Sequence, residues 1–152
     1  MNIALITSFF VLILDQMVKF WTVNHLDLYQ VQRWIPNILD LHYLQNTGAG
    51  WGMFAGQRWF LIALTLLAIA YFAYLSWKNR YAPWIYQLIY GLIIGGALGN
   101  LVDRLLHGYV VDMFKLAFID FPVFNLADAA ISVGTALLII CLLFDKKGWN
   151  YF

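Results

Sequence analysis

The sequence predicts an all-α integral membrane protein with four transmembrane helices and both termini in the cytoplasm. A small extracytoplasmic β platform and an interfacial helix are expected beside them. Of the 152 residues, 63% are hydrophobic and only 11% are charged, whereas a soluble domain averages about 25% charged residues. Four windows are each long and apolar enough to cross roughly 30 Å of hydrocarbon. Between the first two windows, polar and apolar residues alternate, which indicates a half-buried strand.

The four windows are expected at residues 3–20, 59–77, 83–106 and 126–144. The first has the length of a cleaved signal peptide. However, it lacks a basic leading segment, and no small-x-small cleavage site follows its apolar run. We therefore expect it to be retained as a transmembrane helix, and residues 1–152 to form a single membrane domain.

Charge predicts the orientation of the helices. Four basic residues lie in the link between the second and third windows and after the fourth window: Lys78, Arg80, Lys146 and Lys147. With Asp145 they leave a charge of +3 on that side, while five basic residues and seven aspartates leave −2 on the other. Basic residues close to helix ends favour the cytoplasm. The loops 21–58 and 107–125 are therefore expected outside.

The first outer loop is too long for a tight connection, and local patterns divide it. Residues 39–43 (Leu-Asp-Leu-His-Tyr) alternate with period two, which predicts a strand. Residues 34–37 (Trp-Ile-Pro-Asn) are typical of a turn. Residues 21–29 contain aromatic anchors and are expected to form a short interfacial helix.

Charged side chains inside the windows are costly, at about 2.5–3.5 kcal/mol each on insertion scales, and therefore mark candidate functional positions. Asp15 and Lys19 lie one helical turn apart and can pair on one face of the first helix. Two interpretations remain open for this pair. It is either a neutralised structural ion pair or a contributor to substrate positioning.

The third window carries a glycine stripe and a polar line. A glycine recurs at every fourth position, which predicts close packing of another helix: Gly91, Gly95 and Gly99. On a neighbouring face, Asn100 and Asp103 continue a polar line from Gly96 toward the outward end. Arg104 is expected either to pair with Asp103 or to extend to the membrane interface.

Two further aspartates lie at the same outward end. Asp112 is in an apolar stretch after the third window, and Asp128 begins the fourth, three residues after Asn125. Two carboxylates close together in a low-dielectric site share a proton and so supply a base and an acid together. Such a pair can activate water against a peptide carbonyl without metal, serine or cysteine. Alternatively, Asp128 only caps the start of its helix.

Other chemistries are poorly supplied. The three histidines are scattered and form no HExxH pattern for zinc, so neither a metal nor a cofactor is expected. A net charge of +1 leaves no basic face for nucleic acid. Two other classes remain open. A proton-coupled transporter or channel could use the intramembrane aspartates, and a non-catalytic assembly subunit could use the glycine stripe.

The chain resembles lipoprotein signal peptidase, also called signal peptidase II, over essentially its whole length. Four motifs carry the resemblance in this order: LDQMVKFW, NTGAGWGMF, GGALGNLVDRLLHGYVVDMF and FNLADAAISVG. It implies a multi-pass aspartic endopeptidase of the bacterial inner membrane, with its active site toward the outer face. The implied reaction removes the signal peptide from diacylglyceryl-modified prolipoproteins, immediately before the lipidated cysteine. The implied partners are this substrate and membrane lipid, without nucleic acid or an obligatory protein partner.

The resemblance also assigns residues. Its catalytic pair falls on Asp112 and Asp128. The positions that it implies are substrate-binding or supporting are Asp15, Lys19, Asn46, Gly48, Asn100, Asp103, Arg104, Asn125 and Ala127. The glycine loop departs from the family's common N-x-G-A-A-F, because Gly50 and Trp51 follow Ala49 here. This bulkier aromatic is expected to change how the loop packs.

Overall fold

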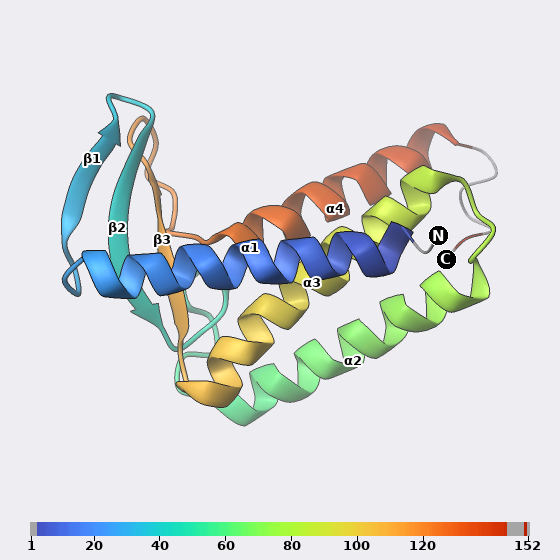
Figure 1. Cartoon of the computed structure of the whole chain (residues 1–152), viewed down its shortest axis with the longest axis horizontal. Helices are drawn as coiled ribbons and strands as arrows, with labels where there is room; N and C mark the ends of the chain where they lie inside the picture. The colour runs from blue at the N-terminus through green and yellow to red at the C-terminus, as the bar shows by residue number, and fades with distance from the viewer. Residues whose placement is uncertain (1–2, 146–150, 152) are drawn as a thin grey trace.

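A computed structural model describes residues 3–145 and 151 of the chain. Four long helices run roughly alongside one another, and a small sheet lies across one end of them (Figure 1). The helices are α1 (Ile3–His25), α2 (Arg58–Lys78), α3 (Trp84–Leu106) and α4 (Leu126–Phe144). Each is long and apolar enough to span a membrane, which confirms the four predicted windows. Lys146 and Lys147, on which part of the predicted orientation depends, lie outside the described residues.

Helix α3 is the centre of the bundle, because α1, α2 and α4 all pack against it. Two-thirds of its most apolar window (67%) is buried, compared with 17–22% for the other three helices. The outer helices therefore turn large apolar side chains away from the protein, as helices in contact with lipid do. The glycine stripe explains the tight packing around α3. A Cβ on Gly95 would lie 2.8 Å from the carbonyl oxygen of Ser8 in α1, and on the neighbouring face one on Gly96 would collide with Ala127 of α4.

The sheet has three antiparallel strands in the order β1-β2-β3. They are β1 (Val31–Ile35), β2 (Leu39–Asn46) and β3 (Val110–Leu116). The predicted strand at 39–43 is confirmed and extends to Asn46. One face of the sheet packs on a small apolar core that includes Leu26, Tyr43 and Met113. The opposite face is free to line a cavity.

Three local predictions differ from the structure. Residues 21–25 continue α1 instead of starting a separate interfacial helix, because the backbone hydrogen bonds run on unbroken to Leu26. Residues 34 and 35 belong to β1, so the turn begins only at Pro36. The strand β3 was not expected at all, since the run from Val110 to Met113 is buried without alternation.

A β-bulge interrupts the outer edge of β3. The backbone N–H groups of Met113 and Phe114 both donate to the carbonyl oxygen of Phe124, at 3.0 and 2.8 Å. Two successive residues opposite one partner bend a strand and redirect its side chains. Asp112 and Lys115 consequently line the same cavity although they are three positions apart, which in a regular strand would place them on opposite faces.

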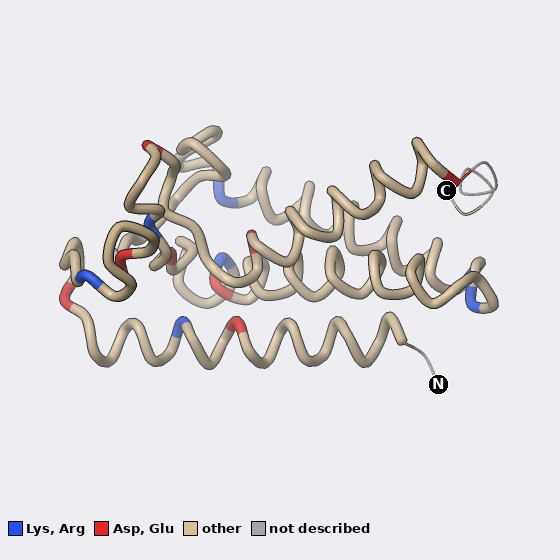
Figure 2. The backbone as a smooth tube through the Cα atoms, turned by 90° about the horizontal axis from the view of Figure 1, so that it is seen from above, with Lys and Arg blue, Asp and Glu red and all other residues tan. Residues whose placement is uncertain are grey.

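Charged residues are unevenly distributed along the bundle. Figure 2 shows them in the half of the molecule that carries the sheet and at the opposite tips of the helices, with uncharged helix between. The first turn of α1 and the last turn of α4 lie together at the end away from the sheet (Figure 1). The polar residues of the predicted site are therefore gathered at one end of the spans.

Candidate active site

A cavity of about 990 Å³ opens between the sheet and the ends of α3 and α4. Its walls come from the free face of β2 and β3, the last turns of α3, the first two turns of α4 and the loop 46–55. Asp112 and Asp128 both line it. The structure thus brings together the two aspartates that the sequence placed at the same depth.

Asp112 is held on β3 with only 2% of its surface exposed. Its Oδ1 accepts a hydrogen bond of 2.7 Å from Asn125, and its Oδ2 accepts one of 3.0 Å from Asn46. Burial raises the pKa of Asp112 to about 7, and the negative charge of Asp128 acts in the same direction. The two amide hydrogen bonds oppose this rise, and burial outweighs them. At neutral pH the carboxyl group of Asp112 is therefore poised to hold or release a proton.

Asp128 lies in the first turn of α4, where it takes part in a capping box. Its backbone N–H donates to the side chain of Asn125 at 2.9 Å, and its Oδ2 accepts from the backbone N–H of Asn125 at 3.3 Å. Its Oδ1 accepts a hydrogen bond of 2.7 Å from Asn100. The capping interpretation is therefore confirmed, yet the same carboxylate also faces the cavity.

One amide connects the two carboxylates. Asn125 is fully buried, and its Nδ2 donates both to Asp112 at 2.7 Å and to the Oδ1 of Asn100 at 3.1 Å. Asn100 in turn donates to Asp128. The separation and orientation of the aspartates thus depend on two buried asparagines.

Beneath the asparagines lies a buried ionic cluster. The Nζ of Lys19 contacts Asp15 at 2.9 Å, Asp103 at 3.0 Å and the Oδ1 of Asn100 at 3.0 Å. The predicted pair of Asp15 and Lys19 is confirmed, and Asp103 joins it as a second counter-ion. Because these groups are almost completely buried, each depends on the others for compensation of its charge.

Asp15 also joins α1 to α4. Its Oδ1 accepts a hydrogen bond of 2.9 Å from the backbone N–H of Ala127. This N–H lies in the first turn of α4, where helix N–H groups lack partners within the helix and favour negative charge. Gly99 of α3 leaves room for the carboxylate, since a Cβ there would collide with it. A residue of the first span therefore caps the helix that carries Asp128.

Arg104 behaves differently from both expectations. Asp103 already forms an ion pair with Lys19. The side chain of Arg104 leaves α3 about 100° around the helix axis from that of Asp103. Its Nη2 donates a hydrogen bond of 2.7 Å to the carbonyl oxygen of Gly48, and only 8% of the residue is exposed. Arg104 therefore neither pairs with Asp103 nor extends to the membrane interface, because the glycine loop provides a buried acceptor.

The glycine loop is tightly folded over the cavity. The N–H of Gly48 donates to the Oδ1 of Asn46 at 2.9 Å, and a Cβ on Gly48 would lie 2.7 Å from the carbonyl oxygen of Met53. Trp51 has a left-handed backbone (φ 55) and packs edge-on against Phe121, with ring centroids 5.6 Å apart. The loop thus contacts both α3 and the segment that precedes α4.

All of the predicted site residues belong to one connected network of hydrogen bonds and ion pairs: Asp15, Lys19, Asn46, Gly48, Asn100, Asp103, Arg104, Asp112, Asn125, Ala127 and Asp128. Sequence reasoning missed Gln16, which donates to Asp103 at 3.0 Å and to the carbonyl oxygen of Gly99 at 3.2 Å. It also missed Arg58, which donates to the last carbonyl groups of α3. The signal for Gln16 was an amide beside Asp15 in an apolar window. Within the described residues, no three His, Cys, Asp or Glu side chains form a metal-binding group.

The sequence of this chain matches those of a known protein family. Residues 7–144 match the sequence model of a family described as signal peptidase (SPase) II. The chain belongs to the signal peptidase II family. It is 43% identical to a lipoprotein signal peptidase of Lactococcus lactis subsp. lactis over 136 residues, which are 90% of each chain. It is 41% identical to one of Latilactobacillus sakei over 147 residues, or 97% of each chain.

Solved structures agree with the sequence relationship. A bacterial membrane enzyme determined at 2.3 Å by the in meso method superposes with a TM-score of 0.89 at 33% identity. The match covers 94% of this chain and 88% of the other. A second bacterial membrane enzyme, determined at 1.9 Å, gives a TM-score of 0.84 over 94% of both chains. The chain is therefore a peptidase of the signal peptidase II family with four membrane-spanning helices.

Proposed function

We propose that this signal peptidase II is an aspartic endopeptidase that removes the signal peptide from diacylglyceryl-modified prolipoproteins. It cleaves on the N-terminal side of the lipidated cysteine, with Asp112 and Asp128 as the catalytic residues. The names of the relatives, which are lipoprotein signal peptidases, support the substrate class. The mechanism rests on the chemistry of the cavity.

The observation that carries the mechanism is the shared environment of the two carboxylates. Asp112 and Asp128 line one cavity and are held by Asn125 and Asn100, which hydrogen-bond to them and to each other. The pKa of Asp112 is raised to about 7 by burial and by the charge of Asp128. One proton between two carboxylates provides a base and an acid at one place.

In the proposed reaction, the ionised carboxylate of Asp128 removes a proton from a water molecule as its oxygen attacks the scissile carbonyl carbon. Asp112 gives its proton to the carbonyl oxygen, which yields a neutral tetrahedral diol. The diol then collapses as a proton passes to the leaving nitrogen and the C–N bond breaks. The products are a signal peptide with a free carboxyl group and a lipidated cysteine with a free amino group. No acyl-enzyme intermediate forms.

The location of the cavity suits a substrate that remains in the bilayer. The dyad lies where the spans meet the sheet, and Ile131 and Val133 of α4 continue the cavity wall into the spanning region. A lipid anchor can therefore stay among hydrocarbon chains while the peptide reaches the aspartates from the side. We propose that the sheet lies outside the cytoplasmic membrane and that both termini lie in the cytoplasm, following the charge distribution.

The same arrangement disfavours a proton-coupled transporter. Asp15 and Asp103 share Lys19, and Lys19 also contacts Asn100, which donates a hydrogen bond to Asp128. The sequence of α2, and those of α4 after Asp128 and α3 before Asp103, contain no aspartate or glutamate. A relay of carboxylates needs them along its length, and these segments supply none.

Cleavage by purified protein tests the proposal. The wild type is expected to release the signal peptide from a synthetic diacylglyceryl-cysteine precursor. Asp112→Asn and Asp128→Asn are expected to leave the precursor uncut at any pH, because neither variant retains both an acid and a base. Asp27→Asn is the matched control, since Asp27 is exposed and distant in sequence from the network.

The unfolding temperature of each variant separates loss of chemistry from loss of fold. Both dyad variants should unfold at temperatures close to that of the wild type, because asparagine retains the size of the side chain. Normal processing by either folded variant would overturn the assignment of the dyad. Proton flux in liposomes that persists in the wild type without any cleavage would instead favour the transporter.

A further inference from the structure

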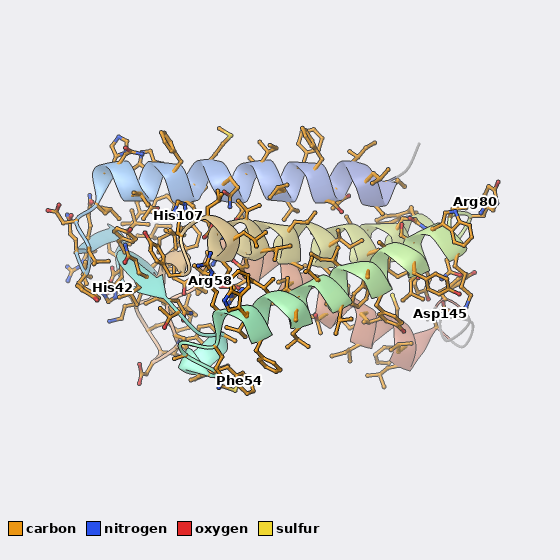
Figure 3. All side chains as sticks on the ribbon, turned by 90° about the horizontal axis from the view of Figure 1, so that it is seen from below. His42, Phe54, Arg58, Arg80, His107 and Asp145 are labelled. Carbon is orange, nitrogen blue, oxygen red and sulfur yellow. The ribbon has the colours of Figure 1, made fainter. Side chains whose placement is uncertain are left out.

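The cavity continues past the dyad along the face of the sheet. This continuation is formed by His42, Lys115 and Asp120, and we call it the lysine end of the cavity. His42 lies at the sheet, far from Arg80 and Asp145 at the other tip of the bundle (Figure 3). The proposed chemistry at Asp112 and Asp128 does not use any of these three side chains.

Polar atoms at the lysine end lack partners. The Nδ1 of His42 is buried and has no hydrogen-bond partner. The half-buried side chain of Lys115 forms no hydrogen bond or ion pair within residues 3–145 and 151, although Asp40 lies opposite it in the strand ladder. An unpaired buried polar group costs about 1–3 kcal/mol, so the buried Nδ1 of His42 calls for an explanation. A ligand that supplies the missing partners provides one.

The charge of the lysine end favours a particular ligand. Burial, with the adjacent Lys115 in second place, lowers the pKa of His42 from its model-peptide value of 6.5, so His42 is neutral at pH 7. Lys115 is then the cation that lines this end of the cavity, and the exposed Asp120 is an acidic group that lines it too. An extended peptide with an acidic side chain matches Lys115, and its backbone N–H groups match the oxygen atoms of Asp120.

The two ends of the cavity differ in polarity, which sets the direction of the substrate. The end toward the spans is lined by Ile131, Ser132 and Val133 of α4, and an apolar signal peptide suits it. The polar lysine end, at the sheet, suits the chain that follows the cysteine. The mature segment is therefore the part of the substrate that runs along β3.

Distance along the strand identifies the residue that reaches Lys115. Each residue of a strand rises about 3.3 Å, so Lys115 lies roughly 10 Å along β3 from Asp112. An extended substrate rises by the same amount per residue. The scissile carbonyl at the dyad belongs to the residue before the cysteine, so the residue roughly 10 Å further along the substrate, near Lys115, is the third mature residue. The bulge at Met113 and Phe114 is what points Lys115 into this path.

We propose that the lysine end of the cavity binds the first residues of the mature lipoprotein, and that Lys115 selects an acidic side chain two positions after the lipidated cysteine. This inference rests on the proposed function, because it extends the substrate from the dyad. It makes Lys115 a specificity-determining residue and leaves the chemistry to the two aspartates.

The test uses full-length enzyme in phosphatidylcholine bilayers and three diacylglyceryl-cysteine precursors that differ only in the third mature residue, which is Asp, Asn or Lys. The wild type is expected to favour Asp over Lys by roughly two- to fivefold in kcat/KM, the range of an exposed ion pair. Lys115→Gln should remove this preference, and Lys115→Glu should invert it. Lys78→Gln, the same change at the far end of α2, should behave as the wild type.

The precursor with Asn shows whether the variant enzyme is correctly folded. Lys115→Gln should cleave this uncharged precursor at the wild-type rate. An identical Asp-to-Lys ratio in the wild type and in Lys115→Gln would overturn the inference while leaving cleavage intact. The proposal would also fail if Lys115→Gln slowed all three precursors equally and only in bilayers with phosphatidylglycerol, since the lysine would then bind a lipid headgroup. If the wild type cut none of the three precursors, the proposed function itself would be contradicted.

Discussion

The Nζ of Lys19 donates a hydrogen bond of 3.0 Å to the Oδ1 of Asn100, and this bond determines which way the amide of Asn100 points. With its oxygen toward Lys19, the amide presents its nitrogen to Asp128 and donates to the carboxylate at 2.7 Å. The reversed amide would set oxygen against oxygen at Asp128. Lys19 therefore orients the carboxylate of Asp128, a proposed catalytic group, through an intermediate side chain.

Replacement of Lys19 by Met is expected to destabilise the fold strongly. The change leaves the buried carboxylates of Asp15 and Asp103 without their shared cation, and breaking a buried pair in this way costs about 3–5 kcal/mol. The unfolding temperature in detergent, followed by tryptophan fluorescence, should fall well below that of Lys78→Met, in which an exposed lysine is changed. Adding Asp103→Asn to Lys19→Met should recover part of the loss. Equal unfolding temperatures for the two lysine variants would contradict the role of the cluster.

Replacement of Asn125 by Asp should separate helix capping from catalysis. Aspartate caps helices as well as asparagine does, but it lacks the N–H group that reaches Asp112 and Asn100. We expect the unfolding temperature to stay near that of the wild type relative to Asn125→Ala, while kcat falls by roughly 100-fold. The added negative charge should also move the basic limb of the pH–rate profile to higher pH. A profile that stays in place would argue against a direct contact between residue 125 and the dyad.

The activity of the wild type should fall as the pH rises above about 7, because Asp112 then loses the proton that it gives to the substrate. The apparent pKa belongs to the coupled pair of aspartates. The profile of kcat/KM against pH measures it directly. The interval from about pH 6 to about pH 9 spans this titration. A profile that stays flat across it would contradict the shared proton.

Stability should show the same titration with a definite sign. The pKa of Asp112 is higher in the folded protein, at about 7, than its ordinary value of 3.8. The folded state therefore retains a proton that the unfolded chain has released, and the free energy of unfolding falls as the pH rises between these two values. In Asp112→Asn this decline should be smaller. An unchanged slope in denaturant titrations at several pH values would show that Asp112 is not the group responsible.

Replacement of Gly99 by Ala should disturb the site although residue 99 does not line the cavity. The added methyl group would collide with the Asp15 carboxylate and approach Ala127 to 3.2 Å. Overpacking of this kind costs about 1–3 kcal/mol, and displacement of Asp15 removes its hydrogen bond to α4. Gly50→Ala is the matched control, since a Cβ there meets no atom within 4 Å. Thermal unfolding and cleavage assays should distinguish the pair, and equal behaviour would refute the steric argument.

The four spans, the strand at 39–43 and the pair of Asp15 and Lys19 could be predicted because each depends on local periodicity. The meeting of Asp112 and Asp128 could be predicted from topology, since their segments flank the same end of the spans. The second counter-ion of Lys19 could not be predicted, because Asp103 is separated from it by 84 positions and the relative rotation of two helices is set by packing. The glycine stripe indicated that rotation only in part.

The missed elements share a physical cause. Residues 31–35 form an edge strand that is exposed on every residue, so it shows no apolar alternation. The strand β3 is buried along its first half and then bulged, which removes the period-two signal from the sequence. Arg104 binds a backbone carbonyl of Gly48, 56 residues away, and a backbone acceptor leaves no trace in residue identity.

The hydrogen bond between Asp15 and the N–H of Ala127 has a consequence for the order of events during synthesis. The carboxylate on the first span acquires this partner only once the fourth span has been made, 112 residues later. Asp128 and Asn125 enter the membrane on that same last helix. Because the proposed dyad needs Asp128, we expect a nascent chain that has inserted only three spans to be inactive, and cleavage to begin only once the fourth span has been made.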